Sequence, residues 1–164
     1  MTWKVGVALL CLLASSCGYS TTSRTAKGIK TIAVPFFDNQ TAEPNLELRV
    51  TEAIIDNLIR DNTLKVVDER DADAILDGTI THFQNVPFSF NAELNAQEYL
   101  VVINVNATLY NRRLNEPIWE NKTIKGDGNY FLDVSTEGLS FDDAVNEALF
   151  EITEKILNLT VQDW

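Results

Sequence analysis

Hydrophobic and polar residues alternate along the chain soon after residue 28. Between Lys30 and Phe37, the side chains of Ile32, Val34 and Phe36 fall on one face. This period of two predicts a half-buried β-strand. Pro35 interrupts the segment, and because proline cannot donate a backbone hydrogen bond, it indicates an edge position or the end of the strand.

Further along, apolar residues recur every three or four positions, which predicts an amphipathic helix. Pro44 or Asn45 can open this helix, and Asn62 can end it. The apolar stripe that we expect to face the core consists of Leu46, Val50, Ala53, Ile54 and Leu58.

The middle of the chain predicts strands joined by turns and loops. In two segments, 84–98 and 126–138, apolar and polar residues follow no regular period, so these segments are predicted to be loops. The predicted strands are 64–68, 74–83, 99–110 and 118–125, of which the third has the longest alternation and pairs with the fourth in a hairpin.

A final helix is predicted to begin after Ser140. Asp143 lies three residues later, as in a capping box with Asp in place of Glu. An apolar stripe then continues from Phe141 to Leu159. Together these elements predict one domain over residues 29–164 with an α+β fold: two helices packed on one face of a small, mostly antiparallel sheet, a two-layer sandwich. The other face of the sheet stays partly polar.

The N-terminus has the pattern of a signal peptide. Lys4 precedes an apolar run of about ten residues, 5–14, which is too short to span a bilayer. Ala14, Ser15 and Ser16 then lead to Cys17, an arrangement that resembles the lipobox of bacterial lipoproteins. We expect residues 1–16 to be a lipoprotein signal peptide, Cys17 to carry the lipid, and residues 17–28 to form a flexible tether. An ordinary secretory signal cut near Ser16 is the alternative.

Composition narrows the possible partners and chemistry. The 164 residues contain 13 Lys and Arg against 24 Asp and Glu, so the net charge of −11 argues against nucleic-acid binding. Both cysteines, Cys11 and Cys17, lie in the first 17 residues. His82 is the single histidine, and no repeated carboxylate or cysteine ligand lies beside it. We therefore expect no metal, no cofactor other than the lipid on Cys17, and no enzymatic activity.

Residues 29–80, IKTIAVPFFDNQTAEPNLELRVTEAIIDNLIRDNTLKVVDERDADAILDGTI, resemble the LptE family of outer-membrane lipoproteins. The later YLVVINVNATLYNRRLNEPIWEN is similar to the same family, and Gly18 after Cys17 resembles the pattern of a lipoprotein sorted to the outer membrane. The resemblance implies a periplasm-facing protein that plugs the LptD β-barrel and helps to place lipopolysaccharide in the outer leaflet.

Two sets of candidate contact residues follow from this resemblance. The family binds lipopolysaccharide through basic side chains, and the candidates here are Arg112, Arg113, Lys122 and Lys125, which all belong to one predicted hairpin. Their alternative role is to keep the hairpin soluble. Aromatic residues in the predicted loops either cap the core or contact a barrel wall or acyl chain: Phe88, Phe90, Tyr130 and Phe131.

A rival interpretation is a lipoprotein that activates a peptidoglycan synthase or forms a curli-type secretion subunit. The tether from Cys17 to Gly28 reaches at most about 40 Å, which favours a partner in the same membrane. A secretion subunit should carry further hairpins of alternating apolar residues, and one long hairpin is evident.

Overall fold

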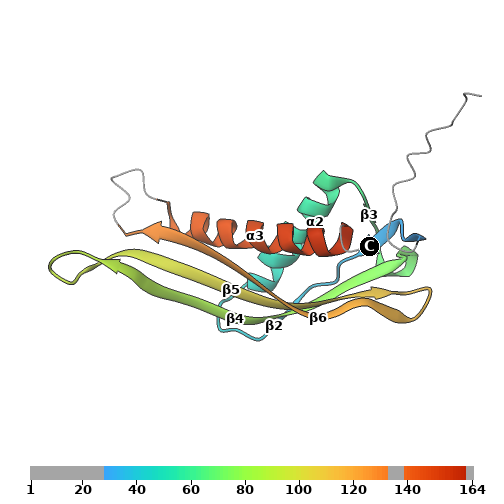
Figure 1. Cartoon of the computed structure of the whole chain (residues 1–164), viewed down its shortest axis with the longest axis horizontal. Helices are drawn as coiled ribbons and strands as arrows, with labels where there is room; N and C mark the ends of the chain where they lie inside the picture. Colours follow the sequence, from blue (N-terminus) through green and yellow to red (C-terminus); the bar gives the residue numbers. More distant parts are fainter. Residues whose placement is uncertain (1–27, 133–138, 162–164) are drawn as a thin grey trace, which may run out of the picture.

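A computed structural model describes residues 28–132 and 139–161 of the chain (Figure 1). The predicted signal peptide, Cys17 and all of the predicted tether except Gly28 lie outside these residues. The described elements, in chain order, are β1 (Thr31–Ala33), β2 (Asp38–Asn39), α2 (Leu46–Asp61), β3 (Lys65–Val66), the 3₁₀ turn η2 (Glu69–Asp71), β4 (Ala74–Phe90), β5 (Ala96–Asn111), β6 (Glu116–Phe131) and α3 (Phe141–Val161).

The strands form one mixed sheet in the order β3-β1-β4-β5-β6, with β2 also paired to β4. The three long strands β4, β5 and β6 are antiparallel, whereas the short strands β1, β2 and β3 pair in parallel. Strand β1 pairs with β4 at Ala74, and β2 joins the same strand further along, at Thr79. The predicted α+β class is therefore confirmed.

Both helices pack on the same face of this sheet (Figure 1). Alternate residues of β5, from Val101 to Leu109, are fully buried beneath them, as are Leu76 and Ile80 of β4. Helix α3 runs along β6, and α2 crosses beside α3. The predicted stripe of α2 is confirmed, since Leu46, Val50, Ile54 and Leu58 are buried and Ala53 is partly buried.

The helix ends follow the predicted signals. Asn62 ends α2 in the left-handed conformation with φ of 56°, and its N–H donates to the carbonyl of Leu58. At α3, the N–H of Asp143 donates to the hydroxyl of Ser140, and the carboxylate of Asp143 accepts from the N–H and hydroxyl of Ser140. These bonds form the predicted capping box, and the hydroxyl and N–H of Ser140 lower the pKa of Asp143.

The prediction of one strand over residues 30–37 is wrong in its second half. Strand β1 ends at Ala33, and the chain passes through Pro35 before β2 begins at Asp38. The break reverses the alternation, so Phe37 is buried and Phe36 is 69% exposed. The N–H of Phe37 donates to the hydroxyl of Thr51 on α2, which fixes the new register.

The first predicted loop, 84–98, is largely strand, and so is the first part of the second, whose residues 133–138 lie outside the described residues. Residues 84–90 continue β4, and residues 96–98 begin β5, so the predicted loop 84–98 contracts to a turn. Residues 126–131 likewise continue β6. Gly126 and Gly128 allow this extension, because a side chain at either position would meet the backbone of α3.

Within the described ranges, no helix has the length and apolar character needed to cross a membrane.

Candidate functional site

The two arginines of the basic set lie in the β5–β6 turn and bind the protein's own backbone. Arg112 donates to the carbonyl oxygens of Arg70 and Ala72. Arg113 donates to the carbonyl of Gly28 at 2.7 Å and pairs with the carboxylate of Asp73 at 3.3 Å. Both guanidinium groups therefore tie the turn to the start of the described chain and to η2.

Asp73 is the centre of this junction. One of its carboxylate oxygens accepts the N–H groups of Lys30 and Thr31, at 2.8 and 3.1 Å, and its own N–H donates to the Thr31 hydroxyl. The N–H of Lys30, followed by that of Thr31 and the guanidinium of Arg113, lowers the pKa of Asp73. The side chain of Asp73, which lies between the predicted strands 64–68 and 74–83, thus joins β1 to β4.

The two lysines lie elsewhere on the hairpin. Lys125 pairs with Asp127 at 2.8 Å and lies opposite Asn104 of β5, which is seven residues, or about 23 Å, from Asn111 at the turn. Lys122 is exposed, and no ion pair is formed by it among the described residues. The four basic residues therefore do not form one cluster, and their binding of lipopolysaccharide stays a prediction.

The second set, the aromatic residues, gathers at the opposite end of the long strands. Phe88, Phe90 and Phe131 are exposed there. Sequence analysis missed three leucines beside them: Leu94 in the β4–β5 turn is 82% exposed, and Leu132 and Leu139 are also exposed. Backbone hydrogen bonds hold these segments together, from Phe131 to Leu139 and from Leu132 to Gln97. We call the six residues Phe88, Phe90, Leu94, Phe131, Leu132 and Leu139 the apolar tip.

Tyr130 differs from the other three aromatic candidates because it packs on the core. Its ring stacks on Tyr99, with centroids 5.4 Å apart, and meets the ring of Phe141 edge-on at 5.7 Å. Its hydroxyl exchanges hydrogen bonds with the side-chain amide of Asn85, across the width of three strands. These contacts belong to a cap over the end of the core, below the first turn of α3.

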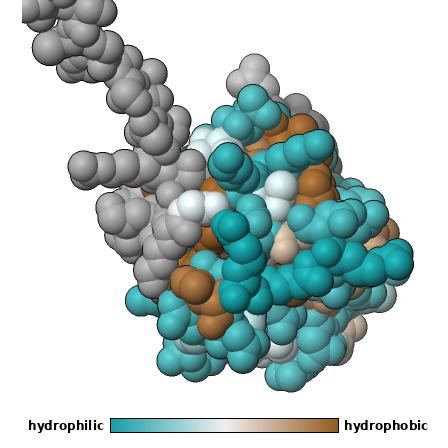
Figure 2. Space-filling model, turned by 90° about the vertical axis from the view of Figure 1, so that its right-hand side faces the viewer, coloured by the Kyte–Doolittle hydropathy of each residue, from teal (hydrophilic) through white to brown (hydrophobic). Residues whose placement is uncertain are grey.

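The apolar tip and the arginine junction occupy opposite ends of an elongated molecule (Figure 1). The tip extends past the first turn of α3, whereas Gly28 lies at the β5–β6 turn. No Lys or Arg occurs between Phe83 and Tyr110, so the tip offers no cation to a phosphate group. Seen from the β5–β6 end, the surface is mostly hydrophilic, with hydrophobic side chains in separate patches (Figure 2).

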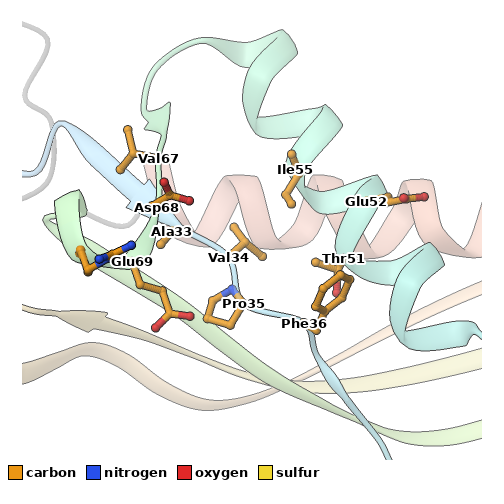
Figure 3. A pocket seen from close by; sticks show the side chains of 11 residues that line it. Ala33, Val34, Pro35, Phe36, Thr51, Glu52, Ile55, Val67, Asp68 and Glu69 are labelled. Carbon is orange, nitrogen blue, oxygen red and sulfur yellow. The ribbon is translucent and has the colours of Figure 1, made fainter.

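A groove that sequence analysis did not identify lies between α2 and the connection from β1 to β2 (Figure 3). Its volume is about 700 Å³, and its apolar lining comes from Val34, Pro35, Phe36, Ile55 and Val67. The signal in the sequence was Pro35, which interrupts the strand and turns Phe36 out of the core.

The rim of the groove is charged. Glu52 of α2 lies on one side, and Asp68, Glu69 and Arg70 at η2 lie on the other. All four side chains are exposed. None of their charged groups has a hydrogen bond or ion pair with another described side chain.

The positions relevant to chemistry are few. His82 is exposed on β4 and lies 3.5 Å from the amide oxygen of Gln84. In residues 28–132 and 139–161, no three His, Cys, Asp or Glu side chains are grouped so that they could hold a metal ion.

Comparison with solved structures identifies the fold. The chain is similar to the hypothetical protein CT253 from Chlamydia trachomatis, with a TM-score of 0.58 and 12% identity over 80% of this chain and 97% of that one. It is similar to protein XCC0632 from Xanthomonas campestris, with a TM-score of 0.60 and 10% identity over 81% and 84%. The PelC dodecamer from Paraburkholderia phytofirmans gives a TM-score of 0.51 and 12% identity over 80% and 88%.

These identities are low, so the three structures establish a shared fold and no shared activity. A search of curated protein sequences finds no match. The model of the LptE family, described as lipopolysaccharide-assembly, matches residues 29–160, which include every described strand and nearly all of both helices. The chain therefore belongs to the LptE family of lipopolysaccharide-assembly proteins.

Proposed function

We propose that this chain is an outer-membrane lipoprotein that fills the lumen of an LptD-like β-barrel and assists the assembly of lipopolysaccharide into the outer leaflet. Membership in the LptE family over residues 29–160 is the observation that carries the proposal. The lipid would be attached to Cys17 and would hold the domain at the periplasmic side of the membrane. In this role the protein binds and positions other molecules, and it needs neither a metal nor a catalytic group.

The shape and polarity of the sheet support a plug. Strand β5 has 16 residues, which corresponds to about 50 Å. On the face turned away from the helices, β5 carries Asn104, Asn106 and Thr108, flanked by Thr79 of β4 and Thr123 of β6. Because the interior of a membrane barrel is polar, such a face can lie against the barrel wall without an extensive hydrophobic interface.

The apolar tip supplies a more local contact in this arrangement. It groups three exposed phenylalanines and three exposed leucines, whereas the β5–β6 turn at the arginine junction carries one exposed leucine, Leu114. Exposed apolar side chains that gather at one end of a protein mark contact with a protein or with lipid. In the proposed complex the tip contacts the barrel or an acyl chain, whereas Tyr130 keeps its role in the core cap.

The test is purification of the tagged, full-length protein from its native envelope in mild detergent, followed by mass spectrometry of the bound proteins. A large outer-membrane β-barrel at a ratio of one to one is the expected result. A peptidoglycan synthase, or a ring of the protein alone, would refute the plug and favour the rival interpretation. A Cys17→Ser variant separates the two parts of the proposal, because it should lose the lipid and still bind the barrel.

A photo-crosslinker at Phe88 or Phe131 tests the role of the tip. We expect both positions to capture the barrel protein, and we expect a matched position at exposed Phe150 on α3 to capture less. Equal capture from all three positions would show that the tip is not a specific contact.

A further inference from the structure

The groove beside α2 is the part of the surface whose chemistry points to a particular ligand. We propose that it binds an extended segment of a partner protein that carries a large apolar side chain next to lysine or arginine. This inference does not depend on the barrel, because it concerns a surface that the family assignment does not explain.

The floor of the groove requires an apolar occupant. Phe36 leaves more than two thirds of its side chain in solvent, and Val34 and Ile55, half-buried, face the same hollow (Figure 3). Exposed apolar surface costs free energy in water, roughly 25 cal/mol for each Å². A volume of about 700 Å³ exceeds what one side chain needs and lies in the range of sites that hold a compact ligand.

The three segments around this floor, which are α2, the connection from β1 to β2 and the connection from β3 to η2, are held in place by contacts with the rest of the domain. Phe37 is anchored in the core and donates its N–H to Thr51, so the neighbouring Phe36 is directed outward by a fixed backbone. On the opposite side, the N–H of Val67 donates to the carbonyl of Ile32, which joins this rim to β1. The groove therefore exists before its ligand arrives, and binding would not require these elements to be ordered first.

The rim determines the charge of the occupant. The residues of the rim carry three carboxylates, of Glu52, Asp68 and Glu69, and one guanidinium, of Arg70, so the rim has a net charge of −2. Because these groups have no charged partner in the described part of the chain, they are available to a cation. The rim would repel the phosphate groups of a lipid. A segment with lysine or arginine beside an apolar side chain could place the apolar side chain on the floor and pair the cation with the carboxylates of the rim.

The test uses the full mature chain with Cys17→Ser, labelled with ¹⁵N, and two acetylated and amidated peptides. The first peptide has the sequence lysine-leucine-phenylalanine-leucine-lysine, and the second has glutamate in place of both lysines. We expect the basic peptide to shift the amide resonances of Val34, Phe36, Ile55 and Val67, and the acidic peptide to leave them unchanged. Raising the salt concentration from about 0.05 to about 0.3 M should weaken the binding, because it screens exposed charges.

Variants separate the roles of the rim and the floor. Glu52→Gln combined with Glu69→Gln should raise the dissociation constant about fivefold, the effect of removing two exposed charge pairs. The matched control is Glu93→Gln combined with Glu120→Gln, which changes the net charge equally at two exposed positions outside the groove. Phe36→Ser should abolish the shifts, and because Phe36 is exposed, the rest of the spectrum should stay that of the folded protein.

The proposal is overturned if the basic peptide shifts no amide of the groove, or if the acidic peptide binds as tightly. It is also overturned if the control pair weakens binding as much as the pair at the rim, since the effect would then come from the overall charge of the protein.

Discussion

The contact between α3 and β6 leads to a prediction about Gly126. A methyl group added there would lie 2.0 Å from the carbonyl oxygen of Ala148 and 2.9 Å from Cγ1 of Ile152. Carbon and oxygen atoms in close contact are normally separated by about 3.3 Å. Gly126→Ala would therefore need α3 and β6 to separate locally by about 1.3 Å, since the obstructing atom belongs to the helix backbone and cannot rotate away.

The cost follows from what this separation disrupts. Ala148 and Ile152 are fully buried at the contact, so a displaced helix leaves gaps along its apolar stripe. Overpacking a core costs about 1–3 kcal/mol, and a clash with backbone belongs at the upper end of that range. We expect Gly126→Ala to lower the free energy of unfolding by about 3 kcal/mol, a large part of the stability of an ordinary domain.

Urea unfolding followed by circular dichroism measures this loss. Thr123→Ala is the matched control, because Thr123 is an exposed residue of the same strand, and its replacement should cost less than about 1 kcal/mol. Gly128→Ala should behave like Gly126→Ala, since its methyl group would lie 2.2 Å from the carbonyl oxygen of Ala144. A loss at Gly126 no larger than that at Thr123 would refute the close packing of α3 on β6.

Three further predictions follow from the described contacts. The pKa of Asp73 is lowered in the folded protein. Its carboxylate therefore stabilises the fold fully at pH values above the pKa of the unfolded state, about 4, and this stabilisation is lost as the pH falls through the pKa of the folded state. Asp73→Asn should therefore reduce the difference between urea midpoints at pH 7 and pH 3, and an unchanged difference would contradict this. Asn57 is buried and hydrogen-bonded to Thr153 and Glu154, so Asn57→Ala should lower the free energy of unfolding, measured by heat or urea, by about 1–3 kcal/mol. A loss below about 0.5 kcal/mol, the size of a surface substitution, would show that these bonds contribute little. Lys122→Gln with Lys125→Gln should weaken retention in a lipopolysaccharide pull-down without unfolding the protein, and full retention would remove these lysines from the candidate set.

The sequence predicts those elements in which one face is buried and the other is exposed, because the spacing of their apolar residues follows the buried face. Helix α2 and strand β5 each have one face against the core, so the spacing of Leu46, Val50 and Ile54, or of Val101, Ile103 and Val105, reports that face directly. The capping box at Ser140 could also be predicted, because all of its atoms lie within four residues.

The extended ends of β4 and β6 could not be predicted in the same way. Phe83 packs against Phe141, the first residue of α3, and most residues of β4 beyond Phe83 are exposed, so both faces of the strand tolerate polar residues and the alternation disappears. Pro87 lies at an irregularity in the register of β4, where a missing N–H is tolerated. Gly126 and Gly128 suggest a loop in the sequence, yet they are required by a helix about 20 residues away.

The candidate sites depended on contacts that spacing does not reveal. Arg112 and Arg113 share a predicted hairpin with Lys122 and Lys125, but the arginines bind carbonyl groups and a carboxylate from residues 28–73. The exposed position of Phe36 depended on a change of register at Pro35. The arginines bind groups 40 or more residues away, and the register after Pro35 is fixed by Thr51 of α2, 14 residues from Phe37, so local pattern alone could not assign these roles.

The separation of the two ends constrains the proposed plug. The tether would join the domain beside the β5–β6 turn, where Arg113 holds Gly28, while the apolar tip lies at the other end of strands that are about 50 Å long. A fully extended tether reaches about 40 Å from a lipid on Cys17, which is about 10 Å less than the length of the strands. With the long strands upright and the tip directed toward the membrane, the tip of the proposed complex therefore lies at least about 10 Å beyond Cys17, inside the barrel. With the strands reversed, the tip projects into the periplasm. Crosslinks from Phe88 to barrel residues near the outer leaflet would support the first orientation, and crosslinks to periplasmic proteins would support the second.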